Sequence, residues 1–360
     1  MNTAVSKSRE SFHNLGRNDE PLVSIIILNF NGRDMLRECL QSVFKTKYSN
    51  YEVIVVDNGS TDNSCTMVER EFPNVRLIKN PRNFGYSKGN NIGILRSRGE
   101  FIVLLNNDTI VTPEWLSELM HEAIQNLYCF YQPKILFNES KRINSAGNFI
   151  QLFGFAFPRG IGDLDNGQYD EKCEVSYASG ACVLVSKRLV EKVGLLDEGL
   201  FTFYEDVNWG WKALMLGYKT AYVPSAIIYH RWGGSWGNVI SSKKFFLIER
   251  SRLLTLFRNY SSRTLLKIFP AFIFTEVLVL LFSLEKGFIR EKLRVYSDML
   301  RVRDILFHQR KAVQKMRKIS DERVIKFFCD GINHPYLGKL AVSVNKLICL
   351  FSKIVRMMIR

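Results

Sequence analysis

The stretch that decides the fold is 23-VSIIILN-29, an apolar run that ends in an asparagine. A polar turn, 29-NFNG-32, follows it, and apolar residues then recur at helical spacing from Met35 to Phe44. This pattern predicts a buried strand followed by a helix. The first turn also lacks the GxGxxG of nicotinamide enzymes, and the chain has no GxxxxGK[ST] of nucleoside triphosphatases.

The same strand and helix unit recurs along the first third of the chain. Strands are expected at 51–56, 75–78 and 101–105, with helices near 65–72, through 92–95 and at 115–124. Strands that alternate with helices at this spacing predict an α/β fold with a mostly parallel, doubly wound sheet. Two more strands are expected at 218–223, closed by Pro224, and at 226–229, just before His230.

Length and cysteine usage suggest a single large domain with an appendage. The chain has 360 residues, of which 46% are hydrophobic, enough for a sizeable core. We divide it into a flexible arm (1–20), an α/β domain (21–260) and a basic, amphipathic helical region expected to associate with a membrane (261–360). Seven separate cysteines without a CxxC pair, and no secretory signal ahead of Pro21, favour a reducing, cytosolic compartment without disulfides or zinc.

The positive charge is concentrated in the last 100 residues. Residues 261–360 hold 20 Lys and Arg against 8 Asp and Glu, a net of +12 out of the formal +15. The apolar run 268–284 is interrupted by Glu276 and Pro270 and has basic residues beyond both ends, which favours an interfacial or re-entrant segment over a span. Residues 289–300 and 344–358 carry apolar residues at helical spacing among basic ones.

Basic amphipathic helices bind membrane interfaces, so the sequence predicts an anionic membrane surface as a partner and no nucleic acid. The expected location is the cytoplasmic side of the cell membrane, in a peripheral or interfacial position. Two alternatives stay open: the stripes could pack on the catalytic domain, or the basic tail could bind nucleic acid with a steep salt dependence.

Polar residues follow the expected strands where a doubly wound sheet binds its ligands, beyond the carboxyl ends. They are Asn29, Asp57 and the segment 106–108, Asn-Asn-Asp. The turn-rich segment 57–64 can hold a base, ribose or phosphate, or be an ordinary turn. Asp108 can bind Mg²⁺ or Mn²⁺ while the ion bridges two phosphates, although the segment could also cap the next helix.

Two further positions carry possible chemistry. Glu205 and Asp206 follow the aromatic run 201–204, a partly dry setting that raises a carboxylate pKa toward that of a general base; the alternative is a solvated turn. His230 ends an expected strand before the glycine-rich segment 231–235, where it could ligate a metal and favour Mn²⁺, or be an ordinary histidine.

Eight motifs in order resemble glycosyltransferase family 2, and within it the rhamnosyltransferase-type members, over about residues 22–251. They are 23-VSIIILN-29, 55-VVDNGSTD-62, 83-NFGY-86 with Gly89-Asn90, 105-LNND-108, Gly180-Ala181, Asp197-Glu198, Glu205-Asp206 and His230. The resemblance implies a GT-A fold, a Rossmann-like sheet, and inversion at the anomeric carbon. It also implies Mn²⁺ or Mg²⁺ as a cofactor and a nucleotide-sugar donor, with deoxythymidine diphosphate rhamnose as the leading choice.

The resemblance also implies roles for individual residues. Asp206 would be the general base, with Glu205 orienting it or the acceptor, and Asp108 would bind the metal with His230 as a second ligand. The remaining implied contacts are to the nucleotide sugar and fall on Asn29, Asp57, Asn83, Gly85, Asn90 and Asn107.

The sequence departs from the family at two places. The DxD-like element reads Asn-Asn-Asp, with one carboxylate, and 207-VNWGW-211 replaces the usual Val-Asp-Leu-Cys-Trp-Arg type, which affects acceptor contacts. The acceptor is expected to be a lipid-linked or cell-surface glycan precursor. An alternative is a membrane-attached partner subunit that keeps the fold without turnover; a glycoside hydrolase is excluded, since it would use neither a metal-binding strand end nor a nucleotide loop.

Overall fold

The computed structural model describes residues 20–126, 128, 130–138, 140–231, 240–332 and 339–359, and for 339–344 it describes the backbone alone. Residues 1–19 of the expected arm and residues 232–235 of the glycine-rich segment lie outside this part.

Ten strands of the described residues form one sheet, in the order β10-β12-β6-β11-β4-β1-β2-β3, with β5 beside β12 and β7 beside β6; β8 and β9 form a separate pair. The strand bounds are β1 (Val23–Asn29), β2 (Tyr51–Asp57), β3 (Arg76–Lys79), β4 (Phe101–Asn106), β5 (Thr109–Val111), β6 (Phe130–Phe137), β7 (Ile143–Ser145), β8 (Asn148–Ile150), β9 (Ala156–Pro158), β10 (Cys173–Val175), β11 (Cys182–Ser186) and β12 (Thr220–His230). The expected strands at 23–28, 51–56, 75–78 and 101–105 are confirmed.

Strand direction changes along this sheet. β1 pairs in parallel with β2 and β4, and β2 with β3, so this half matches the predicted doubly wound arrangement. β11 is antiparallel to both β4 and β6, whereas β12 is parallel to β6. The α/β fold class is confirmed, with a mixed sheet beyond β4. Because β12 has the same direction as β1, β2 and β4, these four strands end at the same edge.

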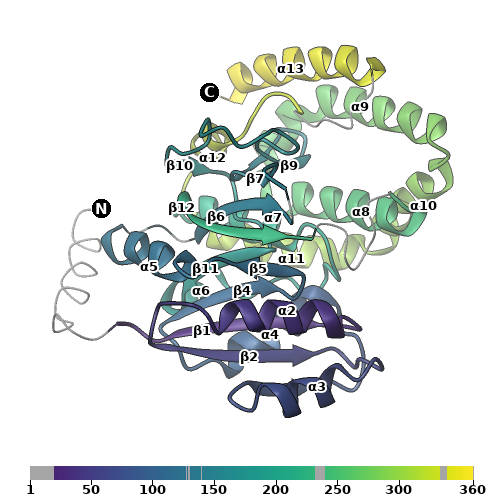
Figure 1. The fold of residues 1–360 in the computed structure, drawn as a ribbon. Coiled ribbons are helices and arrows are strands. Elements are labelled where there is room, and N and C mark those ends of the chain that lie inside the picture. The colour runs from purple at the N-terminus through teal and green to yellow at the C-terminus, as the bar shows by residue number, and fades with distance from the viewer. Residues whose placement is uncertain are drawn as a thin grey trace.

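Helices cover both faces of the sheet (Figure 1). The helix bounds are α2 (Arg33–Val43), α3 (Ser64–Glu71), α4 (Gly85–Arg96), α5 (Trp115–Gln125), α6 (Lys187–Val193), α7 (Glu205–Met215), α8 (Ser242–Asn259), α9 (Ser262–Glu285), α10 (Ile289–Arg301), α11 (Arg303–Met316), α12 (Asp321–Val324), the short 3-10 helix η1 (Ile325–Phe327) and α13 (Lys339–Ile359). The cluster on one face includes α2, α3 and α5, and the cluster on the other includes α4, α6 and α7.

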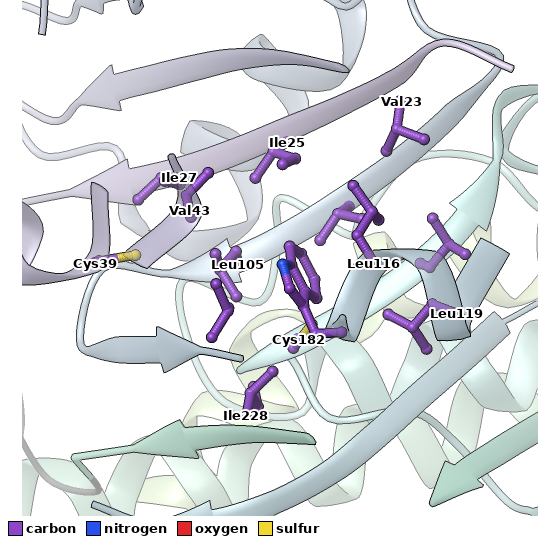
Figure 2. Packing of buried hydrophobic residues seen from close by; sticks show 14 of the residues in the cluster. Val23, Ile25, Ile27, Cys39, Val43, Leu105, Leu116, Leu119, Cys182 and Ile228 are labelled. Carbon is purple, nitrogen blue, oxygen red and sulfur yellow. The ribbon is translucent and has the colours of Figure 1, made fainter. Parts of the chain in front are cut away.

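β1 explains why both faces are covered. Alternate side chains of a strand point to opposite faces, and Val23, Ile25 and Ile27 pack toward α2 and α5 (Figure 2), whereas Ile26 packs on the other side. All four are fully buried. An uninterrupted apolar run is therefore what a two-sided strand requires.

The two strands expected on either side of Pro224 are one strand, β12, so that prediction was wrong. The pairing of β12 with β6 shifts register between Val223 and Ile227 and then continues to His230. Proline has no N–H to donate to a neighbouring strand. The chain accommodates it with a local irregularity instead of ending the strand.

The C-terminal helices pack against the sheet domain through a shared apolar cluster. Trp211 of α7 lies between Tyr260 and Phe328, with ring centroids 4.8 Å away in both cases. The same cluster includes Ile268 of α9 and Val355 of α13. The expected helical stripes at 289–300 and 344–358 lie in α10 and α13, and their inward sides join this core.

Candidate active site

The strand ends of β1, β2 and β4 carry three joined polar side chains. Nδ2 of Asn29 donates to Oδ1 of Asp57 at 3.0 Å, and Nδ2 of Asn107 donates to Oδ1 of Asn29 at 2.7 Å. Oδ2 of Asp57 accepts the backbone N–H groups of Gly59 and Ser60 at 3.1 and 2.8 Å. All three predicted residues are buried, so the structure brings them together as a fixed polar floor.

The turn after β1 is held to the segment after β2. Asn31 has a left-handed backbone, with φ of 49°, and its Oδ1 accepts the N–H of Thr61 at 2.8 Å. A Cβ on Gly32 would lie 2.3 Å from Nδ2 of Asn107, so a glycine is needed here for the close approach. The start of α2 therefore packs closely against Asn107 of the polar floor.

Asn83, Gly85 and Asn90 form a second group at the start of α4. Oδ1 of Asn83 accepts the N–H of Gly85 at 2.8 Å, and Nδ2 of Asn90 donates to the carbonyl of Tyr86 at 3.1 Å. Gly85 has a φ of 82°, and a Cβ there would lie 2.4 Å from the carbonyl oxygen of Phe201. Asn58, which sequence reasoning missed, joins this group to the strand ends by donating to Asn83 and to the carbonyl of Gly85.

Asp108 and His230 meet at the carboxyl edge of the sheet. Nε2 of His230 lies 3.2 Å from Oδ1 of Asp108, and among the described residues this buried oxygen accepts no hydrogen bond. Nδ1 of His230 is 3.3 Å from Oδ1 of Asn144. Since that amide oxygen can only accept, Nδ1 is the donor. Nε2 then faces the carboxylate of Asp108, and an imidazole nitrogen beside a carboxylate oxygen is a pair of ligands that a divalent transition metal can bind.

The acidic pair lies at the first turn of α7. Oδ2 of Asp206 accepts the N–H of Gly180 at 2.9 Å, and its Oδ1 accepts the N–H of Val207 at 2.8 Å. Glu205 is buried, and within the described part of the chain its Oε2 has no hydrogen-bond partner. The alternative of a solvated turn therefore does not hold for Glu205, whereas Asp206 is half-buried.

Burial controls the ionisation of this pair. Burial raises the pKa of Glu205 well above its usual value, and the neighbouring charge of Asp206 raises it further. Burial also raises the pKa of Asp206, although the N–H groups of Gly180 and Val207 partly oppose the shift. A raised carboxylate pKa is what a general base needs near neutral pH.

The turn before this pair is strained. Phe203 and Tyr204 both have left-handed backbones, with φ of 67° and 70°, a conformation that is uncommon for bulky residues and costs roughly 1–3 kcal/mol at each. Tyr204 is buried in the cluster that includes the C-terminal helices. Tertiary packing thus holds the turn that directs Glu205 and Asp206.

A two-residue segment connects the acidic pair with the strand end of β4. The N–H of Gly180 binds Asp206, and the carbonyl of Ala181 accepts the N–H of Asn106 at 3.0 Å. The hydroxyl of Tyr86 donates to the carbonyl of Gly180. Burial raises the pKa of Tyr86 well above its usual value. The negative charges of Glu205 and Asp206 and, more weakly, that of Asp108 raise it further.

Tyr86 is thus a site residue to which sequence reasoning assigned no role. It stays a neutral donor and lies within electrostatic reach of all three carboxylates. Its only signal in the sequence is its place directly after Gly85 in 83-NFGY-86.

Residues 24–194 match the sequence family described as Glycosyl transferase family 2. This segment belongs to that family. The family resemblance noted from the motifs is thereby confirmed for residues 24–194. The matched segment contains the polar floor, the start of α4, Asp108 and Gly180. Glu205, Asp206 and His230 lie beyond it, so their roles depend on geometry.

Several curated proteins are similar to the family 2 domain and its flank. An uncharacterized protein, y4gI, of Sinorhizobium fredii is 31% identical over 62% of this chain and 26% of its own length. The O-antigen biosynthesis protein RfbC of Myxococcus xanthus is 28% identical over 60% and 18%. The low-salt glycan biosynthesis hexosyltransferase Agl10 of Haloferax volcanii is 27% identical over 53% and 61%. The chain therefore spans less than two thirds of each of these relatives.

A solved structure supports the fold of the family 2 domain. The crystal structure of GalNAc-T7 with UDP, GalNAc and Mn²⁺ aligns with a TM-score of 0.55 at 16% identity, covering 68% of this chain and 49% of that one. At this identity the likeness concerns the fold alone, and it agrees with the predicted GT-A architecture.

Proposed function

We propose that the chain is an inverting glycosyltransferase that moves a sugar from a nucleoside diphosphate to an acceptor hydroxyl during glycan biosynthesis. One observation carries this proposal: the Gly180-Ala181 segment binds Asp206 on one side and the backbone N–H of Asn106, two residues before Asp108, on the other, at the edge where β1, β2, β4 and β12 end. A base candidate and a cation-binding carboxylate beside a polar floor suit transfer from a diphosphate donor.

Asp206 would act as the general base. It accepts the proton of the acceptor hydroxyl as that oxygen attacks the anomeric carbon and the bond from this carbon to the diphosphate oxygen breaks. A single displacement inverts the configuration. Glu205, whose pKa is raised by burial and by the charge of Asp206, would orient the acceptor or Asp206.

The polar floor would bind the nucleotide. Asp57, fixed by two backbone N–H groups and by Asn29, would contact the base. Asn107, which donates to Asn29, would add to the same contact surface. Asn83, Gly85 and Asn90 would support the donor side by fixing the start of α4 against the strand ends.

Asp108 and His230 fit a divalent cation, Mn²⁺ or Mg²⁺, because an unpartnered carboxylate oxygen faces an imidazole nitrogen. No group of three or more His, Cys, Asp or Glu side chains that could hold a metal occurs among the described residues. The protein would therefore supply two ligands, Asp108 and His230. Such an ion usually completes its coordination with water and phosphate oxygens. When bound, it would offset the charge that develops on the departing diphosphate.

The donor and acceptor follow from the family and its relatives. Deoxythymidine diphosphate rhamnose is the leading donor, because the motifs resemble those of rhamnosyltransferase-type members. RfbC and Agl10 are named for O-antigen and glycan biosynthesis, which supports a lipid-linked or cell-surface glycan precursor as acceptor, used at the cytoplasmic side of the cell membrane.

A second candidate is a catalytically inactive, membrane-attached partner subunit of a glycan-assembly complex. It is favoured by the single carboxylate in the Asn-Asn-Asp element and by the two-residue ligand set.

The deciding experiment measures nucleoside diphosphate release from a panel of sugar nucleotides, with lipid acceptors, in Mn²⁺ or in EDTA. We expect metal-dependent release from one donor, reduced about 10³-fold in Asp206→Asn and lost in Asp108→Asn. Mn²⁺ binding measured by electron paramagnetic resonance should weaken in Asp108→Asn and stay unchanged in Asp206→Asn. Asp304→Asn, at a side chain that is 83% exposed, is the matched control. No nucleoside diphosphate release from any donor would support the inactive subunit.

A further inference from the structure

Two neighbouring C-terminal helices expose apolar side chains along their length. On α9 the exposed residues include Leu266, at 78%, followed by Phe269, Ile273, Val277, Leu281 and Leu284. On α13 they are Leu347, Leu350, Ile354, Met357 and Met358. The spacing of three and four residues places each set on one side of its helix.

These stripes face away from the protein core. On α13 the buried residues are Ile348, Ser352, Val355 and Ile359, which by helical periodicity lie opposite the exposed set. On α9 the buried side includes Ile268, Phe272 and Thr275. Each helix therefore has one side packed on the protein and the other directed to the surroundings.

α9 and α13 lie side by side and antiparallel at the end of the molecule farthest from β2 and α3 (Figure 1). The rings of Phe274 and Phe351 pack near the middle of both helices, with centroids 4.7 Å apart. Lys267, near the start of α9, binds the carbonyl of Met358, near the end of α13. We call this pair of helices the platform.

By length and composition α9 could cross a membrane, and it is the one helix of the described residues that could; 28% of its most apolar stretch is buried. Its neighbours contradict a crossing. α8 and α10, which precede and follow α9, pack on each other: Arg250 pairs with Asp298 at 2.6 Å, and the rings of Phe245 and Phe288 stack 4.9 Å apart. Both ends of α9 are thus held on the same side.

The middle of α9 is also fixed to the protein. Glu276 pairs with Arg252 of α8 and with Lys292 of α10, at 2.5 and 2.8 Å, and accepts the hydroxyl of Tyr296 at 2.8 Å. Glu249 completes this set, which we call the clamp, by pairing with both cations. All four charged side chains are buried. Inserting α9 across a bilayer would pull Glu276 away from its partners.

We propose that the platform rests in the plane of an anionic lipid bilayer, with its apolar stripes among the acyl chains and the clamp holding α9 parallel to the surface. This goes beyond the proposed transfer reaction and does not depend on it.

Charge complementarity identifies lipid as the occupant. Between Leu266 and Leu284 no exposed residue of α9 is ionisable. Exposed basic residues lie on or next to the two helices, beside the apolar stripes: Arg263, Lys286, Arg290, Lys346 and Lys353. Residues 261–360 carry a net charge of +12. Two copies of this region would repel each other, while anionic headgroups attract it.

The test is sedimentation of the purified full chain with vesicles of phosphatidylcholine, with or without phosphatidylglycerol. We expect binding that is stronger with phosphatidylglycerol and weakened by salt. The variant Ile273→Gln/Val277→Gln/Leu350→Gln/Met357→Gln should bind roughly a hundredfold more weakly. Lys346→Gln/Lys353→Gln should lose part of the preference for phosphatidylglycerol only.

The control is Ile305→Gln/Phe307→Gln on α11, where equally exposed apolar residues lie outside the platform; it should bind like the unmodified chain. Equal weakening in this control, or no vesicle binding by the unmodified chain, would overturn the proposal. So would an oligomer in solution that only the platform variant dissociates. Membrane-bound protein should be released by alkaline carbonate, and resistance to that wash would contradict the in-plane position.

Discussion

The chain buries two pairs of acidic residues, and their surroundings differ. In the clamp, Glu249 and Glu276 face Arg252 and Lys292, so two negative charges meet two positive ones. Glu205 and Asp206 have no cationic partner within ion-pair distance among the described residues, and one oxygen of Glu205 has no partner at all. The first pair is neutralised by its neighbours, whereas the second has no cation beside it among those residues.

The pKa values move in opposite directions for this reason. Burial alone would raise the pKa of Glu276, but the charges of Arg252 and Lys292 outweigh it and lower the value to about 2; the pKa of Glu249 is also lowered. Burial raises the pKa of Glu205 and Asp206. A matched pair holds helices together, whereas an unmatched pair remains available for proton transfer.

The largest expected effect comes from unbalancing the clamp. Glu276→Gln keeps the shape but leaves Arg252 and Lys292 with one carboxylate, which should lower the free energy of unfolding by about 3 kcal/mol. Urea denaturation measures it. Because the folded pKa of Glu276 is depressed, its contribution is present above the unfolded value of 4.5 and lost as pH falls toward 2, so the deficit should narrow over that range.

Glu285→Gln is the matched control for the clamp. Glu285 ends the same helix, and its pair with Lys286 is about half exposed, so its loss should change stability by no more than about 0.5 kcal/mol. Equal losses of unfolding free energy in Glu276→Gln and Glu285→Gln would contradict the stabilising role of the buried clamp.

The next effect concerns the unmatched pair and its pH dependence. A raised folded pKa means that the contribution of Glu205 is fully present below its unfolded pKa and is lost as pH rises through the folded pKa. In Glu205→Gln this loss is absent, so its stability relative to the unmodified chain should increase with pH. The increase is roughly 1.4 kcal/mol for each unit by which the pKa is raised, and denaturation at several pH values measures it. A difference that stays constant with pH would show that Glu205 is ionised normally.

The smallest effect tests how Asp206 is positioned. Tyr86→Phe removes the hydroxyl that fixes Gly180, whose N–H binds Asp206 and lowers its pKa. We expect kcat to fall about tenfold, with the acid limb of its pH profile moved to higher pH. Tyr48→Phe is the control. That buried tyrosine also donates to a backbone carbonyl, but to that of Pro21, which precedes β1 at the end away from the strand-end asparagine Asn29. An unmoved profile in Tyr86→Phe would assign Tyr86 a purely structural role.

The sequence was sufficient for features that repeat locally. The buried strands follow from apolar runs, and Asn29, Asp57 and Asp108 were found because each follows one. The clamp could not be predicted, since Glu276 is 24 residues from Arg252 and 16 from Lys292, and only packing of three helices joins them. On its own Glu276 indicated a charge that a membrane would reject, not an ion-paired anchor.

Other features depended on contacts that no local pattern encodes. Tyr86 acts on Gly180, 94 positions away, and β12 continues past Pro224 because β6 supports it on both sides of the irregularity. The contact between Asp108 and His230 depends on Asn144, which orients the ring from a third segment.

The strained turn at Phe203 and Tyr204 also bears on the order in which parts of the chain fold during synthesis. This backbone is unfavourable by itself, and it persists because Tyr204 is buried in a cluster with Tyr260 of the α8 end and Phe328 beyond α12. During synthesis, strands β1 to β4 leave the ribosome long before Tyr260 and Phe328 do. We therefore expect the nascent chain to form the polar floor early, and the acidic pair to reach its final position only when the last helices dock.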